Sequence, residues 1–148
     1  MSEVTMQRSR PGPGLEQLRV ADVMHAGAMT CPLETPLRDV ARMMAGYRIH
    51  AVIVFGEDTD DGSGSGLWGV VSDLDLIEAA ASGEVDDRTA GGTAVTPALV
   101  ISGDDTVARA AQLMSEYAVT HLVVVDEHSQ RPRGVLSTLD VARVLADS

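Results

Sequence analysis

The sequence predicts an α/β (α+β) fold built from two copies of one strand-helix-strand-strand-helix unit. Three duplicated patterns support this prediction. Two helical patterns overlay at a shift of 70 residues, which is the distance from Tyr47 to Tyr117. A continuous apolar run follows each of them, and a Gly-apolar-apolar-Ser-x-x-Asp string follows each run. A duplicated order of elements in 148 residues indicates two small units that share one core.

The first helix of each unit is predicted from apolar spacing and from a start signal. Residues 37–47 and 107–117 carry apolar side chains three and four positions apart, the spacing of one helix face. Thr35 is the expected N-cap of the first helix, with Pro36 at its first helical position, and Asp105 is the expected N-cap of the second. Both helices are therefore expected to bury one face on a sheet.

The central strand of each unit is predicted at 51–55 and 122–125. Both segments are continuous apolar runs instead of alternating ones, which is typical of strands covered on both faces. Beyond them, 67–76 overlays 132–141, and each of these stretches predicts a short strand, a serine N-cap and a second helix. We expect the helices to cover one face of each sheet and the two sheets to pack together about a pseudo-twofold axis.

Composition marks the expected boundaries. Residues 1–19 are expected to form a flexible N-terminal tail, 20–81 the first unit, 82–92 a polar linker and 93–148 the second unit. The acidic, glycine-containing stretch Asp58–Gly66 is expected to be a flexible loop. Such compositions bury too little apolar surface to offset the entropy that ordering costs.

The charge balance argues against several partners. The chain has 22 acidic and 11 basic residues, a formal net charge of -11, which repels a phosphate backbone and an anionic membrane surface. No apolar run approaches the ~18 residues that a membrane span needs. A single cysteine forms no internal disulfide, so a reducing, cytoplasmic location is expected.

Signals for catalysis or metal binding are thin. Cys31 with His25 and His50 is the one candidate nucleophile group, and it lacks a recognisable local signature. The four histidines do not show the spacing of a metal-ligand pair. We therefore expect no catalysis and no metal site.

The duplicated Gly-apolar-apolar-Ser-x-x-Asp string, in register with the helix and strand before it, resembles the CBS-domain pair, also called a Bateman module. The resemblance covers about 20–146 and includes Val20-Ala21-Asp22-Val23-Met24, which is similar to the turn that opens such units. It implies a regulatory module whose clefts bind AMP, ADP, ATP or S-adenosylmethionine, with no cofactor required. It also implies that binding is relayed to a separate partner protein.

The resemblance implies roles for both serine-aspartate motifs. Asp75 and Asp140 would bind the ribose hydroxyls, and Ser72 and Ser137 would meet a phosphate together with the free N–H groups of the helix start. The alternative is that Ser-x-x-Asp only forms a capping box, in which serine and acid bond each other's backbone. Glu or Gln is the usual residue at the aspartate's position in that box, so aspartate in both copies favours ligand binding.

Further contacts are expected before and within the strands. His50 and Thr120–His121 stand where relatives often carry phosphate-contacting side chains, although backbone groups can satisfy each histidine equally well. An adenine would lie on Met29–Thr30 in the first unit and Leu99–Val100 in the second, residues that can also be plain core. Arg48 is expected to be a solvated charge at a helix end.

The two motifs differ at one position. Asp73 stands inside the first motif, where its carboxylate disfavours a di- or triphosphate, whereas Thr138 occupies the equivalent position in the second. The second unit's cleft and an AMP-like ligand are therefore favoured.

A second hypothesis is a ligand-free protein that keeps the fold only for dimerisation or docking. The resemblance implies a homodimer formed through helices, and the broad apolar faces of 37–47 and 107–117 suit that association. An effector would be a separate protein.

Overall fold

The computed structural model describes residues 14–56 and 66–148 and confirms the tandem α/β repeat. The first half contains β2 (Thr30–Pro32), α2 (Leu37–Tyr47), β3 (Ala51–Phe55), β4 (Leu67–Ser72) and α3 (Asp73–Ala81). The second half repeats that order with β5 (Val100–Ser102), α5 (Val107–Tyr117), β6 (His121–Val125), β7 (Pro132–Ser137) and α6 (Thr138–Asp147). Four short elements precede or join the halves: α1 (Val20–Val23), β1 (His25–Ala26), the 3-10 helix η1 (Val85–Asp87) and α4 (Ala90–Thr93).

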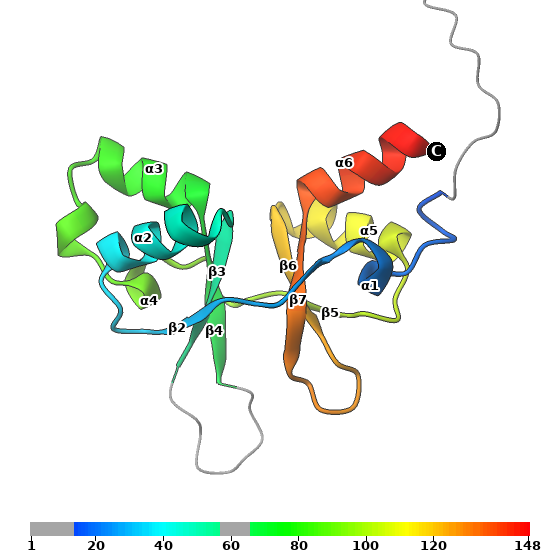
Figure 1. Cartoon of the computed structure of the whole chain (residues 1–148), viewed down its shortest axis with the longest axis horizontal. Helices are drawn as coiled ribbons and strands as arrows, with labels where there is room; N and C mark the ends of the chain where they lie inside the picture. The colour runs from blue at the N-terminus through cyan, green and yellow to red at the C-terminus, as the bar shows by residue number, and fades with distance from the viewer. Residues whose placement is uncertain (1–13, 57–65) are drawn as a thin grey trace, which may run out of the picture.

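The two sheets face each other in the middle of the molecule, and the helices lie outside them (Figure 1). Alternate residues of β3 explain its continuous apolar run. Val52 and Val54 pack under the helices of the first half, whereas Ile53 points toward the other sheet. The core between the sheets is formed by Ala51, Ile53, Val70, Val123 and Val125. A strand buried on both faces needs apolar side chains at every position, as predicted.

Each half has the same strand pairing. β2 is parallel to β3 and β3 is antiparallel to β4; in the same way β5 is parallel to β6 and β6 is antiparallel to β7. The registers correspond too, because Thr30 lies beside Ile53 as Val100 lies beside Val123. The second sheet gains a fourth strand, β1, which pairs antiparallel with β7 although it precedes the first half in sequence.

The halves exchange their opening segments. Val20 of α1 is fully buried in the core of the second half, and Ala90 of α4 is fully buried in the core of the first. The Val20 N–H donates to the carbonyl of Asp105 and the Ala90 N–H donates to the carbonyl of Thr35, both at 2.8 Å. Figure 1 shows the segment containing α1 and β1 crossing from one half to the other. Each half is therefore closed by a segment that belongs, in sequence, to the other.

This exchange changes the roles of the predicted tail and linker. Residues 1–13 of the predicted tail lie outside the described residues. Leu15 and Leu18 pack against the core of the second half, so residues 14–19 do not form a flexible tail. The predicted linker 82–92 contains η1 and α4, and its Val85 packs against the core of the first half. The predicted loop Asp58–Gly66 lies outside the described residues except for Gly66.

The N-caps predicted for the first helix of each half are both wrong by one position. α2 begins at Leu37 with Pro36, not Thr35, at the N-cap. α5 begins at Val107, and its N-cap is Thr106, whose hydroxyl accepts from the N–H of Arg109 at 3.1 Å. The residues before these caps, Thr35 and Asp105, bind the exchanged segments instead, because their carbonyls accept hydrogen bonds from the N–H groups of Ala90 and Val20.

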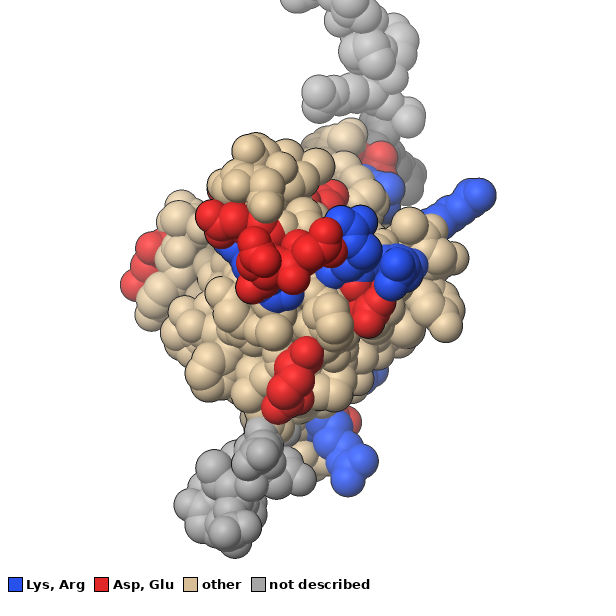
Figure 2. Space-filling model, turned by 90° about the vertical axis from the view of Figure 1, so that its left-hand side faces the viewer, with Lys and Arg blue, Asp and Glu red and all other residues tan. Residues whose placement is uncertain are grey.

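The outer face of the first half carries mixed charge. Figure 2 shows acidic side chains lying among arginines on this face. Arg38 pairs with Asp86 at 2.6 Å, and Arg88 pairs with Glu84 one helical turn away. Exposed pairs of this kind contribute little stability. Within 14–56 and 66–148, none of the helices has the length and apolar character needed to cross a lipid bilayer.

Candidate functional site

A cavity of about 410 Å³ lies between the two halves, within the range of small-molecule sites. Both serine-aspartate motifs contribute to its walls, through the start of α3 and the start of α6. Six of the predicted site residues line it: Met29, His50, Thr120, His121, Ser137 and Thr138. The cavity therefore brings together predicted residues from both units.

Local hydrogen bonds place the helix starts beside the central strands. The Thr138 N–H donates to the carbonyl of Thr120 at 3.0 Å, and the Asp73 N–H donates to the carbonyl of His50 at the same distance. Each bond ties the first residue of a helix to the residue just before a buried strand. The motif and the pre-strand residues, which lie 18 or more positions apart in sequence, consequently share one wall.

The imidazoles in the cavity have different partners. His50 Nδ1 lies 3.0 Å from Asp73 Oδ2, and both side chains are largely exposed. His121 Nδ1 lies 2.9 Å from the hydroxyl of Thr120. Burial lowers the pKa of His121, and the nearby charge of His50 adds to that effect, while the carboxylates of Asp73, Asp140 and Asp75 oppose it. His121 is therefore a neutral hydrogen-bonding group at neutral pH.

The lining of the cavity carries more positive than negative charge, in contrast to the whole chain. Arg48 and Arg143 line it, whereas Asp73 is its one carboxylate among the described residues. That carboxylate is already held by His50. An acidic protein of net charge -11 thus presents a cavity suited to an anionic group.

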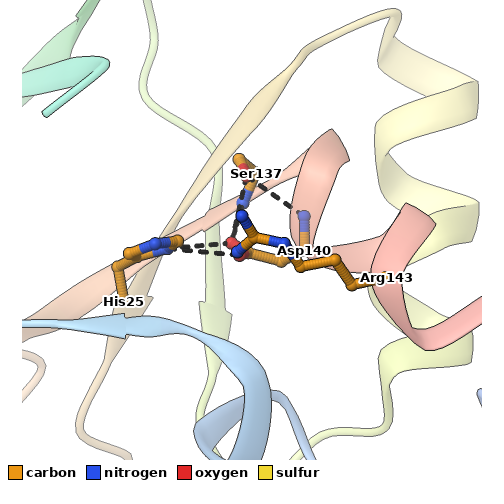
Figure 3. A network of polar contacts seen from close by, with 4 residues as sticks. All are labelled: His25, Ser137, Asp140 and Arg143. Carbon is orange, nitrogen blue, oxygen red and sulfur yellow. Dashed lines mark hydrogen bonds and ion pairs between the residues drawn. The ribbon is translucent and has the colours of Figure 1, made fainter. Parts of the chain in front are cut away.

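Asp140 lies behind the cavity wall in a network of four side chains (Figure 3). Its side chain is 2 % exposed, and its Oδ2 accepts from the Ser137 N–H at 2.8 Å and from the Ser137 hydroxyl at 3.0 Å. His25 Nδ1 lies within reach of both oxygens, 3.2 Å from Oδ1 and 3.3 Å from Oδ2, and Arg143 Nη1 lies 3.8 Å from Oδ1. Oδ2 therefore caps α6, and the carboxylate as a whole also faces His25 and Arg143.

The first motif forms the same capping box. The Ser72 N–H donates to Asp75 Oδ2 at 2.7 Å, and the Asp75 N–H donates back to the Ser72 hydroxyl at 3.4 Å. Both copies thus form a capping box. Six predicted site residues do not line the cavity: Ser72, Asp75, Asp140, Thr30, Leu99 and Val100.

Three polar residues of the site were not among the predicted site residues. Arg48 is exposed at the end of α2, as expected of a solvated helix-end charge, and it also lines the cavity. Arg143 lies three residues after Asp140, a spacing that puts both on one helix face and was a usable signal. His25 arrives through the pairing of β1 with β7, opposite Val135, and only the opening turn at 20–24 pointed to it.

Cys31 lies apart from this cavity. Its thiol is buried on β2, and burial raises its pKa against a smaller opposing effect of a hydrogen bond with Thr35. A protonated buried thiol is a poor nucleophile. Within the described part of the chain, no three His, Cys, Asp or Glu side chains gather where they could hold a metal ion.

Two α/β repeats that exchange their opening segments around a shared cavity define a paired-domain protein. The family model of the CBS domain matches this chain twice, at residues 20–82 and 93–147. The chain belongs to the CBS domain family, and it contains two copies of that domain. None of the curated proteins compared with the sequence matches it.

Solved structures of CBS domain proteins share the fold. The CBS domain protein PAE2072 from Pyrobaculum aerophilum, complexed with AMP, is 25% identical; the match covers 88% of this chain and 100% of that one, with a TM-score of 0.70. Hypoxic Response Protein I with two coordinated zinc ions is 26% identical over 84% of this chain and 97% of that one, with a TM-score of 0.63. The CBS domain pair of MJ0100, in complex with 5-methylthioadenosine and S-adenosyl-L-methionine, is 20% identical over 86% and 95%, with a TM-score of 0.70.

Proposed function

We propose that this chain is a non-catalytic regulatory module that binds an AMP-like, adenosine-containing ligand in the cavity between its halves. The observation that carries the proposal is the positively charged lining of a ligand-sized cavity in an acidic protein. The AMP complex of the similar protein PAE2072 supports the ligand class. In this proposal the module acts in the cytoplasm on a separate partner protein.

The second half supplies most of the proposed phosphate contacts. Thr138 and Thr120 present hydroxyls near the start of α6, where the positive end of the helix dipole favours an anion, and Arg143 adds a positive charge. The Ser137 hydroxyl lies beside them and already donates to Asp140 Oδ2. For the ribose, the proposal assigns Oδ1 of Asp140, because Oδ2 is held by Ser137. Asp73 repels the additional charge of a di- or triphosphate.

AMP is expected to stabilise the protein against thermal unfolding. At a hundred times its dissociation constant, a ligand stabilises by about 2.7 kcal/mol, which raises Tm by about 8 °C for a chain of this length. ADP, ATP and S-adenosylmethionine measured in the same assay give the order of preference. The proposal predicts AMP ahead of ATP.

A reciprocal exchange between the two motifs tests the position of the phosphate. Thr138→Asp brings the carboxylate of the first motif into the second. Its repulsion is expected to weaken the apparent affinity for AMP at least tenfold and so to reduce the AMP-induced rise in Tm. Asp73→Thr removes the corresponding charge and is expected to reduce the difference in affinity between AMP and ATP. Equal AMP shifts in wild type and Thr138→Asp would contradict this placement.

The alternative function, a ligand-free docking protein, is favoured by one observation. The capping boxes Ser72–Asp75 and Ser137–Asp140 are complete within the chain itself. A folded protein whose Tm responds to none of the four ligands would support this alternative and contradict ligand sensing.

We also propose that two copies associate through their helices. Equivalent apolar residues are exposed on both halves, Tyr47 with Tyr117 and Leu74 with Leu139, and Ile77 is 64% exposed beside them on α3. In an isologous interface the same patch of each copy meets its counterpart, so these exposed apolar residues would lie against each other across a twofold axis.

Light scattering is expected to give twice the chain mass of 15.6 kDa at micromolar concentration. Ile77→Asp places a charge in the proposed interface and is expected to shift the mass to that of a monomer, since burying an unpaired charge is costly. Val100→Asp, at an exposed apolar position on β5, serves as the matched control and should leave the dimer intact. A monomeric wild type contradicts the proposal.

A further inference from the structure

A groove of about 470 Å³ lies between α1 and α6 in the second half of the molecule. Two of its polar residues, His25 and Arg143, also line the cavity between the halves. The groove therefore lies behind one wall of that cavity. Its apolar side is formed by four residues from α6 and from the segment that contains α1: Leu18, Val23, Met24 and Val144.

One end of this groove is acidic. α6 ends at Asp147, which lines the groove, and the last turn of α6 contains no basic residue. The side chain of Asp147 is exposed, and it forms no ion pair with any residue in 14–56 or 66–148. Arg143, the one arginine of the groove among these residues, faces the buried carboxylate of Asp140 instead. Because the end of a helix also carries the negative pole of its dipole, this end of the groove favours a cationic group.

The chain itself supplies a basic segment at this place. The Gly14 carbonyl accepts a hydrogen bond from the N–H of Leu18, which lines the groove, so residues 1–13 join the described structure one helical turn away from it. Figure 1 shows the start of the described chain beside the end of α6, in agreement with the groove that Leu18 and Asp147 share. A segment tethered so close to a groove acts at a millimolar effective concentration, so weak contacts are sufficient to hold it there.

The order of side chains in this segment matches the groove. Residues 1–13 contain two basic residues, Arg8 and Arg10, and one acidic residue, in a chain where acids outnumber bases twofold. Val4 and Met6 precede the two arginines at the same alternate spacing. In an extended segment, alternate side chains share one face. That face would present two apolar and then two cationic groups, as an apolar groove with an acidic end requires.

We propose that residues 4–10 bind in this groove of their own chain, as an internal strap across α1 and α6. The two arginines then lie at Asp147 and the end of α6, and the two apolar side chains lie against Val144 and Met24. This arrangement goes beyond the proposed ligand binding and does not depend on it. It would cover the back of the wall that His25 and Arg143 form.

A nitroxide label on the segment measures where it lies in the full chain. Gln7→Cys places the label in the middle of the segment, at an odd position that faces away from the groove in the proposed arrangement. Cys31 is buried, so the reagent reacts with the new cysteine. The amide NMR signals of 21–24 and 144–147 are expected to lose most of their intensity, whereas those of α2 in the other half keep theirs.

Charge variants separate docking from mere proximity of the tether. Asp147→Arg is expected to reduce the signal loss at 21–24 about threefold or more, because it replaces an attractive charge with a repulsive one. Adding Arg8→Asp and Arg10→Asp to this variant is expected to restore the loss. Glu116→Arg is the matched control: it makes the same charge change at an exposed position in the last turn of α5, outside the groove, and should leave the signal loss unchanged.

Salt and a mixed sample complete the test. In the labelled chain without charge substitutions, about 0.5 M NaCl is expected to reduce the signal loss, because salt screens exposed charges. A loss that neither Asp147→Arg nor salt reduces overturns the proposal, since an undocked tether would give the same result. Mixing an isotope-labelled chain that lacks the nitroxide with an unlabelled chain that carries it should leave 21–24 unaffected. An equally strong loss in that mixture would place the segment on a second copy and overturn binding within one chain.

Discussion

Replacing Gly134 with alanine is expected to lower the free energy of unfolding by about 3 kcal/mol, the upper end of the usual cost of overpacking. Gly134 lies on β7, buried beneath β1 of the exchanged segment. A Cβ at this position would overlap the backbone carbonyl of His25 and crowd the sulfur of Met24. Backbone cannot rotate aside as a flexible side chain can, so β1 would have to move away from the sheet.

Chemical denaturation of Gly134→Ala measures this cost, and Gly46→Ala is its matched control. Gly46 lies inside α2, and a Cβ there meets nothing within 4 Å. The control is expected to gain about 1 kcal/mol, because alanine favours the helix over glycine. If Gly134→Ala unfolds at the wild-type denaturant concentration, β1 contributes nothing to the packing of the second sheet.

The first motif has the same constraint at its glycine. A Cβ on Gly69 would lie 2.5 Å from the carbonyl oxygen of Val95, and Val95 pairs with Val70 as an isolated bridge. The glycine of each repeated motif is thus explained by the segment that crosses it. The serine and aspartate of each motif instead form the capping box at the start of the following helix.

Much of this fold follows from local patterns in the sequence. The continuous apolar runs at 51–55 and 122–125 correctly predicted strands covered on both faces, and the duplicated strings predicted the repeat. The exchange of opening segments was not predictable in this way. His25 pairs with Val135, 110 residues further along, and no local periodicity records which sheet edge a two-residue strand joins.

The candidate site, like the fold, could be predicted only in part from the sequence. Residues next to a predicted strand or helix start, such as His121 and Thr138, line the cavity that the fold forms between the halves. That Arg48 also lines it was not predictable, because a position at a helix end does not show what lies opposite. The choice between capping and ligand binding for Asp140 stayed open for a physical reason, since the carboxylate caps α6 through Ser137 and its Oδ1 accepts no hydrogen bond from that serine.

Asp140→Ala is expected to lower the free energy of unfolding by about 2 kcal/mol. The carboxylate is buried, it accepts two hydrogen bonds from Ser137, and its other oxygen faces His25. Loss of an N-cap partner costs about 1 kcal/mol, and hydrogen bonds to a charged buried acceptor contribute more. Asp75→Ala is the matched variant in the first motif; its expected cost is about 1 kcal/mol, because Asp75 is less buried and no histidine faces it.

A double-mutant cycle with His25→Ala isolates the contact that the second motif has and the first lacks. Coupling between His25 and Asp140 is expected at about 0.5 kcal/mol or more, and no coupling is expected between His25 and Asp75. A coupling energy of zero for the first pair would show that the 3.2 Å approach contributes nothing to stability. The capping oxygen would then account for the whole effect of Asp140→Ala.

An asparagine variant separates the two proposed roles of the Asp140 carboxylate, capping and ribose binding. Asp140→Asn retains one oxygen that can accept from the Ser137 N–H, so it is expected to recover about half of the stability lost in Asp140→Ala. It replaces the other oxygen with a donor, so the AMP-induced rise in Tm is expected to remain small. Recovery of stability without recovery of the AMP response assigns Oδ2 to the cap and Oδ1 to the ribose. Recovery of both shows that the carboxylate acts only as a cap, because an amide then suffices.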